Sequence, residues 1–253
     1  LQANQIRVPH RFFDYAVPPV LDWNSLTLRQ SAADHHRIVT LLRDLYRGPW
    51  VNTGGSKGGM TALFHRRFHP RDVTATVAYV APLLLAREDP RPIDMIRDDL
   101  GDEDCRARIR SYQRAMLQQR SAMINRLAVF SQQSGLPFSM GYARALEYAV
   151  LEFPFAFWQY GPTDCDTVPG PGASVATMFD YLDGTVDMAY YADPYIAYFY
   201  PAFYQFLTET GYTAIYTDPV ADLLQAVPNP DYADFAPPDA ALVYQPEAMQ
   251  DIL

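Results

Sequence analysis

The stretch NTGGSKGGM, residues 52–60, constrains what this chain can fold into more than any other segment. Gly54 to Gly58 fit the pattern G-x-S-x-G, with a short apolar run before them and apolar residues at helical spacing after them. A serine at a sharp strand-to-helix corner has a strained backbone, so small residues are expected on both sides of it, and Gly55 and Gly59 are expected to relieve crowding further. The stretch predicts a corner that presents the hydroxyl of Ser56.

A serine presented in this way is typical of a catalytic nucleophile. The backbone N–H of Lys57 then points at the developing oxyanion, helped by the helix dipole. A phosphate-binding turn or a plain tight turn are the alternatives, although the run lacks the ending of a P-loop. The Lys57 side chain is a further alternative as the base, which we disfavour because adjacent residues on such a corner point in different directions.

A serine nucleophile needs a histidine base and an orienting acid. The sequence has five histidines, none of them after position 69: His10, His35, His36, His65 and His69. In hydrolases with a nucleophile elbow, the acid and then the histidine follow the serine on later loops of the sheet. We therefore expect both partners to lie outside this chain, and we expect the chain to be the middle of a longer protein.

A metal site is not expected. His65 and His69 lie four residues apart on one predicted helix, a spacing that some zinc sites use. Arg66 and Arg67 stand where a metalloprotease needs a glutamate, so we interpret both histidines as helix residues that pack near Pro70. The sequence gives no indication of a cofactor.

Residues 1–92 predict part of an α/β layer, because strand and helix patterns alternate there. The expected strands are Gln5–Phe13, a buried strand at 49–55, and Thr74–Pro82; the expected helices run from a cap at Asn24 or Ser25 to Gly48, and from Ser56 to just before Pro70.

Residues 93–240 predict a large, mostly helical cap, and residues 241–253 a return towards a missing C-terminal core. We expect one long helix over Glu103–Gln133 that Gly135 stops, and a second from Tyr142 that Pro154 kinks or divides. The tail is loop-like, with a helix beginning at Pro246.

Composition excludes two classes of partner. The net charge is −9 and the basic residues form no block, which argues against nucleic-acid binding. The longest uncharged aromatic stretch, Pro194–Thr208, is too short for a membrane span and contains two prolines. The two cysteines, Cys105 and Cys165, are either free thiols or one disulfide, which would close a loop worth about 4 kcal/mol. No targeting signal is visible in this chain.

Several segments, read together, resemble one family. They are Arg11-Phe12-Phe13, Asp22-Trp23, residues 30–37, TGGSKGGMTA around Ser56, Arg66-Arg67-Phe68 with Pro70, TVAYVAP, Gly101-Asp102 with Cys105, Phe157-Trp158-Gln159-Tyr160, and Asp164-Cys165. The chain resembles the secreted prolyl tri/tetrapeptidyl aminopeptidases of actinobacteria, which are serine peptidases of the α/β-hydrolase fold.

The resemblance implies that Ser56 is the nucleophile and that the Lys57 N–H forms half of the oxyanion hole. It implies a Cys105–Cys165 disulfide and an exported protein. The implied activity is the release of short peptides, often ending in proline, from substrates with a free N-terminus. The triad acid and base of the family have no counterpart here, so the isolated chain is expected to be inactive or nearly so.

An aminopeptidase must also bind the ammonium of its substrate, and a carboxylate in a partly dry cleft suits that task. Glu147 and Glu152, on the helix after Tyr142, are the candidates, with Glu147 preferred; both could instead belong to a solvated helix face. Two other classes stay open, a fragment of an esterase or lipase and a non-catalytic binding protein on the same scaffold. The sequence does not indicate an oligomeric state.

Overall fold

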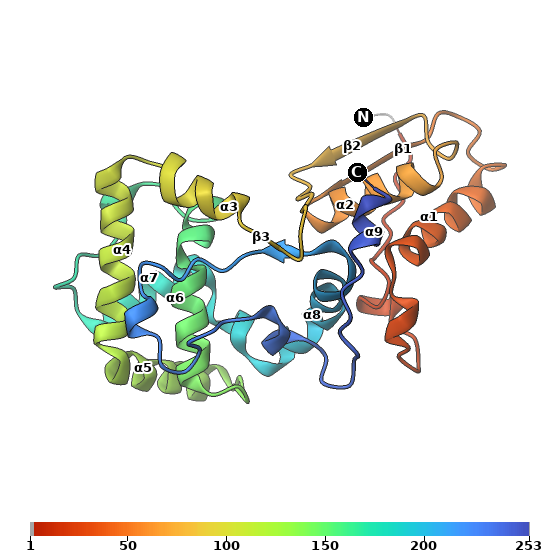
Figure 1. The fold of residues 1–253 in the computed structure, drawn as a ribbon. Coiled ribbons are helices and arrows are strands. Elements are labelled where there is room, and N and C mark those ends of the chain that lie inside the picture. Colours follow the sequence, from red (N-terminus) through yellow and green to blue (C-terminus); the bar gives the residue numbers. More distant parts are fainter. Residues whose placement is uncertain (1–2, 253) are drawn as a thin grey trace. The chain divides into compact units, whose positions relative to one another are not determined.

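The computed structural model describes residues 3–252, which form two compact units (Figure 1). The first unit consists of Leu1–Asp89, Tyr200–Tyr212 and Phe235–Leu253. The second consists of Pro90–Phe199 and Thr213–Asp234. The fold is mixed α/β and mostly helical, and none of its described helices has the length and apolar character needed to cross a membrane.

The bounds of the strands and helices follow the chain. The strands are β1 Val51–Gly55, β2 Ala75–Tyr79, β3 Glu88–Asp89 and β4 Tyr212–Thr213. The helices are α1 Leu28–Leu42, α2 Lys57–Phe68, α3 Arg91–Asp94, α4 Glu103–Gln118, α5 Arg120–Ser134, α6 Tyr142–Gln159, α7 Val175–Val186, α8 Asp193–Gln205 and α9 Pro246–Gln250, with π-helical turns at Met95–Asp99 and Phe206–Thr210.

In the first unit, β1 and β2 pair in parallel, with Val51 opposite Ala75 and Gly55 opposite Tyr79. This confirms the predicted order of strand, helix and strand. The prediction that β1 is buried is wrong, because the described part of this sheet holds only two strands and alternate side chains face solvent. Val51 is 55% exposed and Tyr79 is 61% exposed.

Helices α1 and α2 pack beside this sheet, and α9 lies next to α2 (Figure 1). Their shared core contains Leu28, Ala32, Met60, Phe64 and Met249. The prediction that Asn24 or Ser25 caps α1 is wrong. The Thr27 side chain caps it instead, by accepting the N–H of Gln30 at 3.1 Å.

The predicted strand at Gln5–Phe13 is absent from the described residues. The N–H of Phe13 donates to the His10 carbonyl at 3.0 Å and so closes a turn, and Phe12 has a φ of 70°. The Phe12 ring packs edge-on against Trp23 at 5.9 Å. The apolar residues in this segment therefore anchor an irregular turn rather than one face of a strand.

In the second unit, α4, α5, α6 and α7 pack together, and α5 turns away from the axis of α4 (Figure 1). The prediction of one helix over Glu103–Gln133 is wrong, because the backbone leaves the helical conformation at Gln119, with φ −99° and ψ 24°. Met116 before the break and Met123 after it are both fully buried, so the break lets both segments face the core. Gly135 ends α5 in the left-handed conformation, as predicted.

Helix α6 is the central helix of this core. It runs unbroken from Tyr142 to Gln159 through Pro154, so of the two predicted effects, a kink or a division of the helix, the division is wrong. Phe153 and Phe157 are fully buried around the proline, and tertiary packing on all sides offsets the loss of one helical hydrogen bond.

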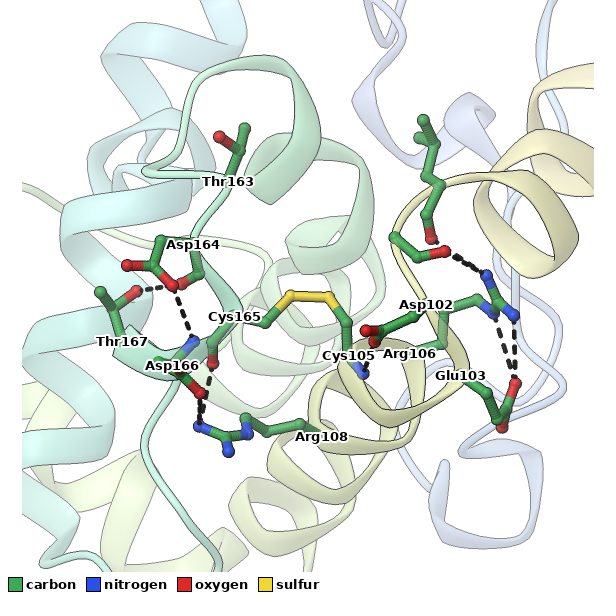
Figure 2. Close-up of a disulfide and its surroundings, with 12 residues drawn as sticks. Asp102, Glu103, Cys105, Arg106, Arg108, Thr163, Asp164, Cys165, Asp166 and Thr167 are labelled. Carbon is green, nitrogen blue, oxygen red and sulfur yellow. Dashed lines mark hydrogen bonds and ion pairs between the residues drawn. A yellow bond between two sulfur atoms is a disulfide. The ribbon is translucent and has the colours of Figure 1, made fainter.

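A disulfide joins Cys105 at the start of α4 to Cys165 in a 3₁₀ turn, with 5.4 Å between the two Cα atoms (Figure 2). Asp102 fixes the first half by accepting the Cys105 N–H at 2.8 Å. The Arg108 guanidinium fixes the second half by donating to the Cys165 carbonyl at 3.2 Å. The bridge therefore ties the segment after α6 back onto α4.

Candidate active site

Ser56 stands at the corner between β1 and α2. Its φ of 52° and ψ of −124° lie in a region that non-glycine residues rarely adopt. The Ser56 N–H donates to the Tyr79 carbonyl at 3.0 Å, and the Ser56 carbonyl accepts the N–H of Met60 at 3.1 Å. The strained residue is thus held on one side by β2 and on the other by the first turn of α2.

Two glycines make room for this corner. A Cβ on Gly54 would lie 2.3 Å from the carbonyl carbon of Gly58, and a Cβ on Gly59 would lie 2.9 Å from the Tyr79 carbonyl oxygen. A Cβ on Gly55 would meet nothing within 4 Å, so the prediction that Gly55 relieves crowding is wrong. Strand and helix approach each other at Gly54 and Gly59.

The hydroxyl of Ser56 is free for chemistry. It makes no capping bond to α2, and the residue is exposed. The N–H of Lys57, the first residue of α2, belongs to the helix N-terminal donors that have no partner inside a helix. An exposed hydroxyl and a backbone N–H therefore occur side by side at a helix N-terminus, where the helix dipole favours negative charge.

The Lys57 side chain is committed elsewhere. Its Nζ donates to Oε1 of Gln205 and lies 5.8 Å from the centre of the Phe206 ring. Burial lowers the Lys57 pKa to about 8, and the nearby carboxylate of Glu209 opposes this shift. These contacts support the interpretation that Lys57 contributes its backbone and does not serve as the base.

Glu209 is the acidic partner inside this network. Burial raises its pKa to about 7, against the opposing effects of the Leu28 N–H and of Lys57. The Leu28 N–H donates to Oε2 of Glu209 at 2.7 Å, so Glu209 also holds the first turn of α1. The network of Lys57, Gln205 and Glu209 therefore links the start of α2 to the start of α1.

None of the histidines in the described part of the chain is hydrogen-bonded to Ser56. His10 lies 3.4 Å from the Thr61 hydroxyl, and burial together with Lys57 and His35 lowers its pKa to about 4. His36 and His65 both contact the carboxylate of Asp72. Among the described residues, the exposed serine at the corner thus has a neighbouring backbone N–H but no histidine bonded to it.

In the second unit, Glu147 of α6 is fully buried. It pairs with Arg120 and accepts the backbone N–H groups of Gln225, Ala226 and Val227, at 2.8 Å for Val227. Burial alone would raise its pKa, but the three N–H groups and Arg120 outweigh it and hold the pKa below its usual value. All of these contacts are structural ones.

Glu152 of α6 has a different environment. It is half-buried, and burial raises its pKa to about 7 in spite of a hydrogen bond from Tyr232. The pKa of Tyr191 is raised mainly by burial and then by the charge of Glu152. The pKa of Tyr160 is raised mainly by burial, then by Tyr190 and then by Glu152. Glu152 is thus a carboxyl group among tyrosines.

Sequence reasoning did not find the partners of Lys57. Gln205 comes 148 residues after Lys57, and no local pattern links the two. The one signal in the sequence is Glu209, an acidic residue in an otherwise uncharged stretch, which suggests a nearby cation but does not identify Lys57.

Comparison with known proteins places the chain in a family. The family model described as PS-10 peptidase S37 matches residues 1–253. The chain is 33% identical over 255 residues to the prolyl tri/tetrapeptidyl aminopeptidase of Streptomyces mobaraensis, and the match covers 100% of this chain and 54% of that protein. It thus spans about half the length of the curated relative, and no solved structure matches it significantly. The chain belongs to the PS-10 peptidase S37 family.

Proposed function

We propose that the protein to which this chain belongs is a serine exopeptidase that releases short peptides, often proline-containing tri- or tetrapeptides, from free N-termini through an acyl-enzyme. The first unit supplies part of an α/β-hydrolase core, and the second unit supplies its helical cap. The observation that carries the proposal is the backbone of Ser56, strained at a strand-to-helix corner beside a free N–H. The similarity to an aminopeptidase supports the substrate class.

The triad acid and base are assigned to polypeptide outside this chain, because no described histidine contacts Ser56 and the relative is about twice as long. On this basis the isolated chain binds and positions a substrate poorly and hydrolyses it at background rate. Residual catalysis then comes only from the oxyanion donor and from binding.

For the substrate ammonium, the contacts favour Glu152 over Glu147. The Glu147 carboxylate already receives Arg120 and three N–H groups, which leaves it no capacity for a ligand. Glu152 is half-buried among tyrosines, whose rings and hydroxyls suit an ammonium ion. We therefore assign the role of nucleophile to Ser56 and that of amine-binding carboxylate to Glu152.

Matched glutamine variants distinguish the two glutamates in this chain. Glu152→Gln is expected to raise the free energy of unfolding at pH 8 by up to about 3 kcal/mol. The pKa of the folded carboxyl is raised to about 7, so ionisation of Glu152 destabilises the folded protein increasingly as the pH rises from about 4.5 through 7, and glutamine removes this penalty. Glu147→Gln is expected to lower the free energy of unfolding by about 3 kcal/mol, because the largely covered Arg120 guanidinium loses its charge partner. Urea unfolding at pH 5 and pH 8 measures both. A gain for Glu152→Gln that is equal at both pH values would contradict the assignment.

The function itself is tested with the whole protein and two chromogenic substrates, Ala-Ala-Pro-p-nitroanilide with a free and with an acetylated amino group. We expect cleavage of the free peptide, at least about 100-fold slower cleavage of the acetylated one, and no cleavage by the 253-residue chain alone. Glu152→Gln should raise KM for the free peptide only. Equal rates on both substrates, or hydrolysis of simple esters alone, would exclude an aminopeptidase. Full activity of the 253-residue chain would show that the general base does not come from outside this chain.

Export follows from the same proposal. The Cys105–Cys165 disulfide is typical of proteins outside the reducing cytosol, and the resemblance is to secreted enzymes. The substrates are therefore peptides in the surroundings of the cell.

A further inference from the structure

Four of the five histidines gather at one place in the first unit, although none is in contact with Ser56. His35 and His36 come from α1, His65 from α2, and His69 from the end of α2. The His36 and His69 rings stack with centroids 4.1 Å apart, and the His35 and His65 rings lie 5.6 Å apart. Neither the elbow nor the predicted chemistry uses this cluster.

Asp72 lies at the centre of the cluster. Its Oδ2 is 2.7 Å from Nδ1 of His36 and 2.9 Å from Nε2 of His65. The N–H of Asp72 donates to the His69 carbonyl at 3.1 Å, which closes a turn and fixes the two residues beside each other. One donor atom from each of His36, His69 and Asp72 lies within 4.8 Å of the others.

We propose that His36, His69 and Asp72 bind one divalent transition-metal ion, of the class of Zn²⁺. Two imidazole nitrogens and one carboxylate oxygen form a ligand set that such ions prefer, with water in the remaining positions. At bond lengths of about 2.0–2.1 Å, tetrahedral ligand atoms stand about 3.3 Å apart. The donor atoms, which now lie within 4.8 Å of one another, move to that spacing when the ion binds, and the ion replaces the His36 contact to Oδ2.

The surroundings of the three ligands fit a metal site. Asp72 is only 10% exposed in its side chain and is held from the protein interior by the buried ring of His65, which acts as the supporting partner that orients a ligating carboxylate. The His36 side chain is 46% exposed, which gives an ion access from solvent.

The ligands differ from the pair that local spacing singles out. His65 and His69 lie four residues apart, but His65 supports Asp72, while His36, from another helix, joins His69. The site therefore depends on the packing of α1 against α2, and no single segment of the sequence predicts it.

The test is calorimetric titration of the tag-free, chelator-treated chain with ZnCl₂ at pH 7.5. We expect one ion per chain, with affinity lowered about 100-fold or more in the His36→Gln/His69→Gln double variant. His35→Gln is the matched control, because its ring faces His65 rather than Asp72, and it should retain the affinity. Circular dichroism confirms that each variant is folded.

A second readout uses Cu²⁺, whose electron paramagnetic resonance spectrum should show coupling to two ring nitrogens in the wild-type chain and to one in either single variant. Absence of stoichiometric binding by the wild-type chain, or equal affinities of the wild type and the double variant, would overturn the site. A loss in His35→Gln as large as that in the double variant would also overturn it, since binding would then be diffuse. None of these outcomes depends on peptidase activity.

Discussion

Ser56→Ala in the whole protein should lower kcat for peptide release by about 10⁴-fold or more, and should abolish labelling by a serine-directed fluorophosphonate. In the proposed mechanism the hydroxyl forms the acyl-enzyme, so its loss would leave only substrate binding and the Lys57 N–H to act on the scissile bond. The effect on stability should be small, because Ser56 is exposed and its side chain caps nothing. Rates, labelling and urea unfolding are measured on the same preparation.

Ser134→Ala is the matched control for this variant, since that hydroxyl makes only local contacts at the end of α5, with the carbonyls of Phe130 and Ser131 and the N–H of Leu136. It should keep full activity and full labelling. A Ser56→Ala protein that is still labelled, or that still releases peptide at the wild-type rate, would place the nucleophile elsewhere.

Gly54→Ala should prevent the elbow from forming. The new Cβ would stand 2.3 Å from the backbone carbon of Gly58, and neither atom can move without separating β1 from α2. We expect a loss of about 4–5 kcal/mol in the free energy of unfolding of this chain, at the upper end of single-substitution effects, and an inactive whole protein. Urea unfolding checks the first part.

Gly55→Ala provides the comparison, because it lies on the same strand and its Cβ would meet nothing within 4 Å. It should change the stability by less than about 1 kcal/mol. Equal losses in the two alanine variants would contradict a specific role for the close approach of Gly54 to Gly58, because the lower entropy of the unfolded chain favours alanine at both positions.

The local chemistry of the corner could be predicted from the sequence, because a serine flanked by glycines between a strand and a helix is typical of such a bend. The stop at Gly135 could be predicted for a similar reason, since it depends on residues close in the chain. The order of β1, α2 and β2 could be predicted from the alternation of strand and helix patterns. The break at Gln119 could not, because no glycine or proline marks it and it follows from burying Met116 and Met123 together.

The same limit applies to the candidate site. Whether Glu147 or Glu152 is available for a ligand depends on residues far away in the sequence. The Glu147 carboxylate is occupied by N–H groups from residues 225–227, and only tertiary structure brings them to α6. The partners of Lys57 and the ligands around Asp72 also come from segments far apart in the chain. Residue types identified the candidates, whereas packing decided their roles.

The two-stranded parallel sheet has a practical consequence for work with this chain. Parallel sheets are normally covered on both faces, yet Val51, Tyr79 and Val80 are exposed along β1 and β2, beside strand edges that have no further partner among the described residues. Such edges template pairing between molecules. Self-association of the chain should therefore rise steeply with protein concentration, and dilute samples should remain monomeric longest.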